Sequence, residues 1–211
     1  MASSSIQKIS LSQNIWNMVL DETNKHLYIE IRNEDDQNMQ VIQIDLESMT
    51  KNLLSSTFDW WNKLVGAEDG FLYVVTYHDK QNPANHSFTQ VHASDLTRQE
   101  VQELPNWHEK SIHPFVYESD TEYHKTVSDF LSLEQPLSCE YLEWNDKIII
   151  SYYVRSENVF DRYLLLLKDG NKEWKVCQDQ EMKGFAPGAF FVFENQLIFI
   201  QDRNEVCVYT G

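Results

Sequence analysis

The chain has 211 residues, of which 42% are hydrophobic, so it can fold as one or two globular domains rather than remain disordered. Its 33 acidic and 17 basic residues give a formal net charge of −16, which argues against nucleic acid and anionic membranes as partners because both bind cationic surfaces. The three cysteines have no CxxC spacing, which predicts free thiols. The sequence shows neither an apolar leader nor an apolar run of membrane length, so we expect a cytoplasmic protein.

A tight polar turn followed by an apolar strand occurs four times along the chain. The apolar strands begin at Leu27, Leu72, Ile148 and Leu197. Their spacings are 45, 76 and 49 residues. Hairpin repeats of about 40–50 residues are typical of β-propeller blades, and the longer middle spacing indicates an insertion of about 30 residues. We therefore expect a single all-β domain over residues 1–211, a four-unit antiparallel β-propeller or propeller-like meander.

The first two repeats cover about residues 12–57 and 58–105. In the first, strands are expected at residues 15–20, 27–31, 40–44 and 53–54; in the second, at residues 72–77, 88–91 and 100–104. The pair Trp16 and Asn17 returns as Trp61 and Asn62, which favours packing of both tryptophans inside their repeats. Trp60 and Trp107 break the repeat; contact with a partner is the alternative for them, but burial is the preferred interpretation.

Residues 106–138 form the insertion, in which residues 112–117 are expected to be extended. Ser119 and Glu122 have the spacing of a capping box. The apolar residues that follow, at i, i+4, i+7 and i+8, are Tyr123, Val127, Phe130 and Leu131. This spacing predicts one apolar stripe of a helix near residues 120–133, before Pro136. The sequence leaves open whether the insertion is a degenerate fifth blade.

The third and fourth repeats cover about residues 139–180 and 185–211. Asp169 and Gly170 are a strong hairpin signal within the third repeat. The fourth repeat ends after three strands, which would leave an unpaired edge. We expect the N-terminal segment, residues 5–11, to supply the missing strand by pairing with residues 206–209 and so to close the meander.

The four repeats resemble those of a small β-propeller, without the signatures of WD40 or kelch proteins. The segment His-Pro-Phe-Val-Tyr (residues 113–117) with the helix after it, and Cys-Glu-Tyr-Leu-Glu (residues 139–143), are similar to a bacterial family of unknown function. This resemblance implies no activity, because propellers host both binding and catalysis.

The loops of an up-and-down meander point to where a site should lie. Loops after the second strand of each repeat, and connections between repeats, emerge on one face, and the insertion belongs to the same face. The candidate contact residues there are His78, Asp79, His86, Trp107, His108, His113 and Asp161. Six of the seven histidines lie between residues 78 and 124, but none has HxxxH or HExxH spacing, so we expect neither a metal nor another cofactor.

The leading hypothesis is a non-enzymatic module that binds a protein or a small molecule through the loop face and the helical insertion. The alternative is a hydrolase or lyase with carboxylates and histidines in the propeller mouth, although nothing in the sequence pairs them as acid and base. A structural subunit is a third possibility. Exposed aromatics such as Trp107 and Phe115 would favour the module, whereas a deep mouth lined by ionisable groups would favour the enzyme.

Overall fold

The chain folds into two compact units. A computed structural model describes residues 5–79, 81–107, 110–119, 121–133, 137–188 and 190–211, with the backbone alone for residues 55–57. The N-terminal unit is Ile9–Lys110, and the C-terminal unit combines residues 5–8 with Ser111–Gly211. The helix found in the described residues is too short to cross a membrane. The assignment of residues 1–211 to a single domain stays a prediction.

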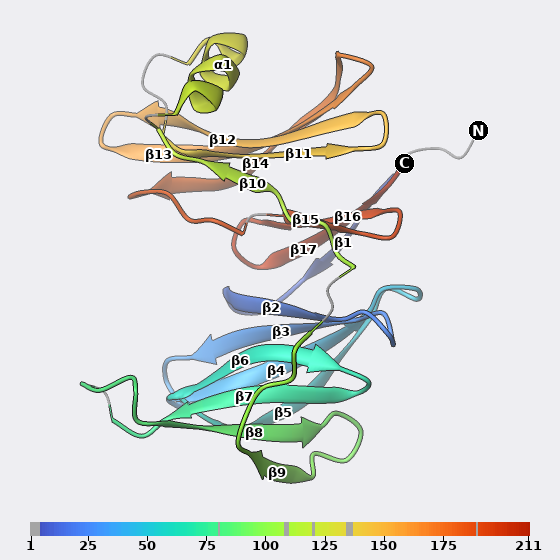
Figure 1. Cartoon of the computed structure of the whole chain (residues 1–211), viewed down its shortest axis with the longest axis vertical. Helices are drawn as coiled ribbons and strands as arrows, with labels where there is room; N and C mark the ends of the chain where they lie inside the picture. Colours follow the sequence, from blue (N-terminus) through green and yellow to red (C-terminus); the bar gives the residue numbers. More distant parts are fainter. Residues whose placement is uncertain (1–4, 80, 108–109, 120, 134–136, 189) are drawn as a thin grey trace. The chain divides into compact units, whose positions relative to one another are not determined.

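The described part of the N-terminal unit contains two four-stranded antiparallel sheets, in which each strand pairs with the next along the chain (Figure 1). The first sheet consists of β2 (Ile15–Asp21), β3 (His26–Asn33), β4 (Asn38–Asp45) and β5 (Thr50–Asp59). The second consists of β6 (Asn62–Glu68), β7 (Phe71–Tyr77), β8 (His86–His92) and β9 (Arg98–Val101).

The C-terminal unit contains a five-stranded and a four-stranded antiparallel sheet in its described residues. The larger sheet is β10 (Phe115–Tyr117), β11 (Cys139–Trp144), β12 (Lys147–Ser156), β13 (Val159–Lys168) and β14 (Asn171–Met182). The smaller sheet has the order β1 (Ser5–Ser10), β17 (Glu205–Thr210), β16 (Gln196–Gln201) and β15 (Phe190–Phe193).

The N-terminal strand completes the last sheet, as the sequence predicts. β1 lies beside β17, so the fourth repeat gains the strand that it lacks. Lys8 reinforces this pairing, because its Nζ donates to Gln201 Oε1 at 2.9 Å and lies 3.2 Å from Glu205 Oε2. The sheets and the helix of the described residues confirm an all-β, propeller-like meander of four units with an inserted helix.

The repeated turn contains a residue with left-handed φ in each of its four copies. A residue with left-handed φ precedes β3, β7, β12 and β16: Lys25 (54°), Asp69 (51°), Asn145 (56°) and Glu194 (51°). Asp69 is followed by Gly70 at 82°, which a residue with a Cβ adopts only at a cost. Asp169 and Gly170 are both left-handed, the geometry of the hairpin turn that their sequence predicts.

Each unit buries an apolar core between its two sheets. The core of the N-terminal unit contains Tyr28, Met39, Val41, Phe58, Leu64, Leu72, Val74 and Val91. That of the C-terminal unit contains Leu142, Trp144, Ile149, Leu164, Leu166, Phe190, Leu197, Phe199 and Tyr209. A further cluster around Ile150, Tyr152 and Leu165 occupies the other face of the five-stranded sheet. The insertion covers that face.

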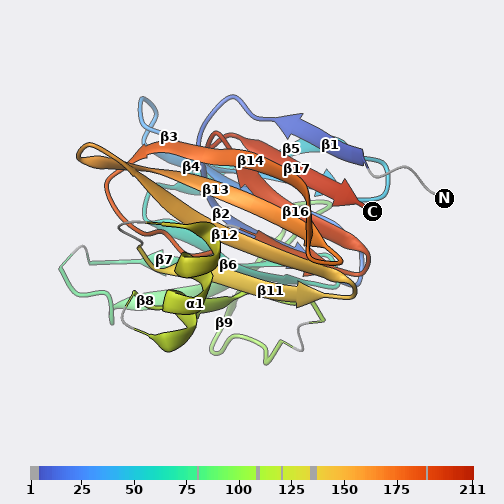
Figure 2. The same cartoon turned by 90° about the horizontal axis from the view of Figure 1, so that it is seen from above.

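The insertion joins the third sheet rather than forming a fifth blade within the described residues. β10 is an edge strand whose residues Phe115 and Tyr117 pair with Tyr141 and Cys139 of β11. The helix α1 (Glu122–Leu131) lies over the same sheet in both views (Figures 1 and 2). Before β10, Ile112 forms a two-hydrogen-bond bridge with Val192 at the start of the last sheet.

The helix differs from its prediction in its cap and in its buried face. Thr121, not Ser119, is the N-cap, since its side chain accepts from the backbone N–H of His124. Val127 and Leu131 pack on the sheet, but the other half of the predicted stripe, Tyr123 and Phe130, is 69% and 61% exposed. His124 and Ser128 are buried instead, so the helix is rotated relative to its apolar stripe. Pro136 lies outside the described residues.

Candidate functional site

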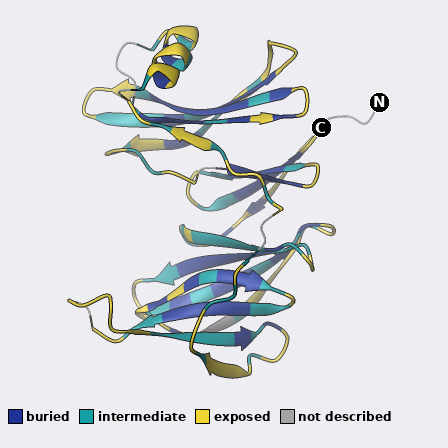
Figure 3. Cartoon of the chain, in the orientation of Figure 1, coloured by how far each residue is buried: buried dark blue, intermediate teal, exposed yellow. Residues whose placement is uncertain are grey.

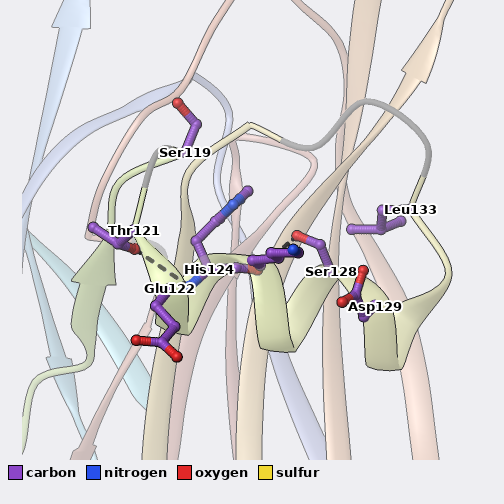
Figure 4. Close-up of a pocket in the computed structure, with 8 residues that line it drawn as sticks. Ser119, Thr121, Glu122, His124, Ser128, Asp129 and Leu133 are labelled. Atoms are coloured by element: carbon purple, nitrogen blue, oxygen red, sulfur yellow. Dashed lines mark hydrogen bonds between the residues drawn. The ribbon is translucent and has the colours of Figure 1, made fainter.

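A hollow of about 500 Å³ lies beside α1 in the C-terminal unit. Its lining comes mainly from one side of the helix, as Figure 4 shows, and consists of Ser119, Thr121, Glu122, His124, Lys125, Ser128, Asp129 and Leu133. The volume suits a small molecule. However, seven of its eight lining residues are of polar types, and the charged ones, Glu122, Lys125 and Asp129, are exposed, so the hollow does not enclose a ligand.

The buried histidine of this hollow is held in a structural role. His124 is 2% exposed, and its Nε2 donates to the carbonyl oxygen of Leu137. Because a carbonyl oxygen only accepts, Nε2 carries the proton and is not available to act as a base. Ser128 Oγ donates to the His124 carbonyl at 2.7 Å, and Ser138 Oγ donates to Glu118 Oε2 at 3.0 Å. The His124 bond fastens the helix to the chain that leaves it, and the Ser138 bond joins the segments before and after the helix.

The N-terminal unit gathers three turns at one end, which we call the loop end. Asn33 pairs with Asn38 across the β3–β4 turn, and Asn38 pairs in turn with Asp59, just before the β5–β6 turn. The N–H of Tyr77 donates to the carbonyl of Trp61 at 3.0 Å, which brings the β7–β8 loop to the same end. This arrangement agrees with the expectation that such loops share a face.

An arginine is enclosed at the loop end by a carboxylate and two indole rings, a group that we call the tryptophan stack (Trp16, Arg32 and Trp60). The Arg32 guanidinium carbon lies 5.5 Å from the ring centroid of Trp16 and 5.4 Å from that of Trp60. Its Nη2 donates to Glu30 Oε1 at 2.5 Å and to the Asn62 carbonyl at 2.6 Å, and its Nη1 donates to the Trp60 carbonyl. The second oxygen of Glu30 accepts from the Leu64 N–H at 2.8 Å.

The asparagine of each Trp-Asn pair, rather than the tryptophan, has the structural role: Asn62 is buried and Asn17 is half-buried. Asn17 Nδ2 donates to the Leu64 carbonyl at 2.6 Å, and Asn62 Nδ2 donates to Thr76 Oγ1 at 2.7 Å. In contrast, Trp16 is 59% exposed and Trp61 is 38% exposed, so the prediction that they pack inside their repeats is wrong. Trp16 is the extra residue of a β-bulge between Ile15 and Asn17, which turns its side chain out of the ladder.

Three of the predicted contact residues lie together at the loop end. His78 and Asp79 follow β7, and His86 begins β8 opposite Tyr77. All three are exposed. His78 Nε2 is 2.9 Å from Ser87 Oγ, His86 Nδ1 is 2.9 Å from the Pro83 carbonyl, and Asp79 Oδ1 accepts from the Gln81 N–H at 2.9 Å. Their contacts therefore stabilise the loop itself.

The remaining predicted contact residues are elsewhere. Trp107 is half-buried in the N-terminal unit, with its ring 5.7 Å from that of Tyr73 and so close to Gly66 that a Cβ there would collide with it. In the C-terminal unit, His113 is exposed and stacks on Phe191 at 5.6 Å. Asp161 accepts from the Glu181 N–H at 3.2 Å. His108 lies outside the described residues.

The C-terminal unit has its own buried polar group, covered by the loop after β14. Glu140, 1% exposed, accepts from the Gly188 N–H at 2.6 Å. Arg162 Nη1 donates to the Ala186 carbonyl at 3.0 Å, and the Tyr153 hydroxyl accepts from the Ala186 N–H at 3.0 Å. Burial raises the pKa of Tyr153 above its ordinary value, although the bond to Ala186 and the charge of Arg162 oppose this effect. These groups fasten the loop.

Metal and thiol chemistry receive little support from the described part of the chain. No group of three or more His, Cys, Asp or Glu side chains there is arranged to hold a metal ion. Burial raises the pKa of the Cys139 thiol to about 11 and that of Cys207 to about 12, and both side chains are buried. Such thiols stay protonated near neutral pH and are poor nucleophiles.

The tryptophan stack was not predicted from the sequence. The residues come from β2, β3 and the β5–β6 turn, so no local spacing joins them. One signal was the irregularity of Trp60, which has no counterpart in the other repeats. The alternation of Glu30, Ile31 and Arg32 also placed two charges on one side of a strand, and opposite charges two residues apart on one face of a strand are able to pair.

No protein-family model and no curated protein sequence matches the chain. Among solved structures it is similar to the β-propeller domain of the Trilobed protease from Pyrococcus furiosus, at 12% identity and a TM-score of 0.31, over 94% of this chain and 56% of that one. It is also similar to an acylaminoacyl peptidase from Pyrococcus horikoshii, at 11% identity and a TM-score of 0.25, over 90% of this chain and 36% of that one. The chain thus spans about half and about a third of those two proteins.

Proposed function

We propose that the chain is a non-enzymatic interaction module whose helical insertion binds a protein partner, with the loop face as a further contact surface. One observation carries this proposal. Among the described residues, nine large hydrophobic side chains are exposed, and five of them fall in the insertion: Ile112, Phe115, Val116, Tyr123 and Phe130. Figure 3 shows this exposure along β10 and on the outer side of α1. Concentrated apolar exposure of this kind is typical of an interaction surface.

Strand pairing and ring stacking within the insertion hold these aromatic side chains in place. Phe115 is 68% exposed on the edge strand β10, where its backbone is held by pairing with β11. The ring of Tyr123 stacks on that of Tyr117 at 5.3 Å, which links the helix to the end of the same strand. Aromatic side chains on a fixed backbone lose little conformational entropy when a partner covers them.

The charge around these aromatics indicates the chemistry of the partner. Glu118, Glu122 and Asp129 are exposed beside them, against Lys125 as the basic neighbour on the helix. The whole chain carries −16. A partner with an apolar patch bordered by basic residues complements both features, and such complementarity raises the rate of association.

The hydrolase or lyase alternative stays a prediction, and no comparable observation favours it. Among the described candidates, His78, Asp79 and His86 make contacts within their own loop. His113 stacks on Phe191, and Asp161 accepts from the Glu181 N–H, so none of these contacts is an acid–base pair. The likeness of residues 113–117 and 139–143 to a bacterial family of unknown function also stays a prediction, as does a cytoplasmic location.

A capture experiment with matched surface variants tests the proposal. Wild-type chain and the variant Phe115→Ala/Tyr123→Ala/Phe130→Ala are immobilised and exposed to lysate of the source organism, with Ile6→Ala/Leu53→Ala as the control. Ile6 and Leu53 are also exposed but lie outside the insertion. We expect a specific partner to be retained by wild type and control and to bind at least about tenfold more weakly to the insertion variant.

Two results would contradict the proposal. One is a partner that the insertion variant retains as well as wild type does. The other is a substrate of low molecular weight that the chain converts. Circular dichroism and a melting curve confirm that each variant is folded, because surface truncations are expected to change stability by about 0.5 kcal/mol or less.

A further inference from the structure

The tryptophan stack of the N-terminal unit has an exposed side that its structural role does not require. Arg32 is held by Glu30 and by the carbonyls of Trp60 and Asn62, and its side chain is only 8% exposed. Trp16 nevertheless stays 59% exposed. An indole left in water over a large part of its surface is able to receive a second planar group.

The stack shows which chemical group these rings accept. The Nε of Arg32 is buried and has no hydrogen-bond partner in the described residues, while the rings of Trp16 and Trp60 lie over the same guanidinium. The two rings meet edge to face, with an interplanar angle of 70°, so the guanidinium lies in a corner formed by two aromatic groups. Trp is the best aromatic partner for a cation, and arginine is the cation most often found on it.

Four carboxylates surround this end of the unit. Glu34, Asp35 and Asp36 form the exposed β3–β4 turn, and Asp59 precedes Trp60. The pairing of Asn38 with both Asn33 and Asp59 places the two acidic segments side by side. None of the four forms an ion pair with a lysine or arginine of the described chain. Their combined field attracts cations to the exposed indole.

We propose that the loop end binds a basic segment of a partner protein through an arginine that stacks on Trp16, with flanking cations against Glu34, Asp35 and Asp59. This inference rests on the proposed function only in treating the chain as a binding protein, since its residues belong to the N-terminal unit and none of them is part of the insertion. A sugar ring can also stack on tryptophan. However, the four carboxylates, which form no ion pair with a lysine or arginine of the described residues, favour a cationic ligand over a neutral one.

The test uses the full chain and a short peptide, acetylated and amidated, that carries three arginines. Binding is followed by calorimetry and by tryptophan fluorescence at low salt. The matched probe is the same peptide with citrulline at each arginine, which keeps the shape and removes the charge. We expect the arginine peptide to bind, the citrulline peptide to bind at least about tenfold more weakly, and affinity to fall as salt rises.

Variants separate the two parts of the site. Trp16→Ala removes the platform, and Glu34→Gln/Asp35→Asn removes two charges without changing side-chain shape; each is expected to weaken binding about tenfold. The double variant Glu100→Gln/Glu157→Gln removes two exposed carboxylates elsewhere and is expected to bind as wild type does. Phe115→Ala/Tyr123→Ala/Phe130→Ala is also expected to bind the peptide normally, which distinguishes this site from the insertion.

Three outcomes would overturn the inference. Equal binding of the arginine and citrulline peptides would show that charge is not recognised. Unchanged binding by both the Trp16 and the acidic-turn variants would place the peptide elsewhere. Binding of neutral oligosaccharides with loss on Trp16→Ala, and no binding of the arginine peptide, would assign the platform to sugars instead. The acidic-turn variant keeps the test decisive even if Trp16→Ala disturbs folding.

Discussion

Each unit buries a glutamate and an arginine, but the groups that contact these charges differ between the two units. In the N-terminal unit, Arg32 bonds to Glu30 and to backbone carbonyls, and the rings of Trp16 and Trp60 also lie against its guanidinium. In the C-terminal unit, Glu140 and Arg162 bond to the backbone of residues 186–188. Backbone groups satisfy the buried charges of both units, but the aromatic cover of Arg32 leaves Trp16 59% exposed. The binding surface that we infer in the N-terminal unit is thus a consequence of how its buried charge is covered.

The exposed apolar surface of the C-terminal unit has a different origin. It lies on inserted residues rather than on the repeats, because β10 and α1 cover the face of the five-stranded sheet that carries Ile150, Tyr152 and Leu165. The helix turns Val127 and Leu131 toward that face, and His124 and Ser128 are buried with them. Tyr123 and Phe130 are left exposed, so insertion of a short segment creates a surface that the repeats do not provide.

The largest effect is expected from breaking the buried pair of the N-terminal unit. Glu30→Leu leaves Arg32 buried without its carboxylate and should lower the free energy of unfolding by about 3–5 kcal/mol. The double variant Glu30→Leu/Arg32→Met removes both charges and should cost about 1–3 kcal/mol, mainly because the Leu64 N–H loses its acceptor. Urea unfolding measures both. A double variant as unstable as the single one would show that the charge left behind is not the cause.

A smaller effect is expected when one glycine in each unit is replaced by alanine. Gly66→Ala places a methyl group against the ring of Trp107 and should destabilise by about 1–3 kcal/mol, with a change in tryptophan fluorescence. Gly184→Ala in the C-terminal unit meets no atom within 4 Å and should change stability by about 0.5 kcal/mol or less. Equal stability of the two variants would contradict the close packing of Trp107 on β6.

The cap of α1 offers a third comparison, within the insertion. Thr121→Ala removes the acceptor for the His124 N–H and should cost about 1 kcal/mol, measured by urea unfolding. Ser119→Ala, at the position that the sequence pattern favours, should cost much less. The reverse order would return the N-cap to Ser119 and shift the start of the helix.

The smallest effect is expected from the three cysteine thiols, all of which lie in the C-terminal unit. A thiol reagent at pH 8 should label the half-buried Cys177 first and should reach Cys139 and Cys207 only on unfolding. Since the folded pKa of Cys207 is about 12 against an ordinary 9.0, the folded chain keeps a proton that the unfolded chain releases. Stability is therefore unaffected by this group below pH 9 and falls between about pH 9 and 12. Rapid labelling of Cys207 in the native chain at pH 8 would contradict its burial.

The elements that the sequence predicts well are those set by local chemistry. The four turns before β3, β7, β12 and β16 were predicted from their clusters of polar and glycine residues, among which Asp69, Gly70 and Asn145 are of the types that favour the left-handed backbone. The pairing of β1 with β17 followed from counting strands. The turns depend on residues that are neighbours in the sequence. The pairing of β1 with β17 depends only on the requirement that the edge of a sheet be covered.

What the sequence did not predict depends on distant contacts. A recurring Trp-Asn pair shows that two positions are equivalent, but it does not say which of the two residues is buried. The bulge at Trp16 and the hydrogen bond of Asn17 to Leu64 decide that, and they involve three strands. The buried face of α1 was likewise decided by the bond from His124 to Leu137, which no helical periodicity shows.

Hydrogen exchange on the chain, with and without its captured partner, can locate the surface that the partner covers. We expect slower exchange in Phe115–Tyr117 and Glu122–Leu131 when the partner is bound, with little change in β14 or β16, because the insertion is the proposed binding surface. Unchanged exchange in both insertion segments, with protection confined to other parts of the chain, would contradict this proposal.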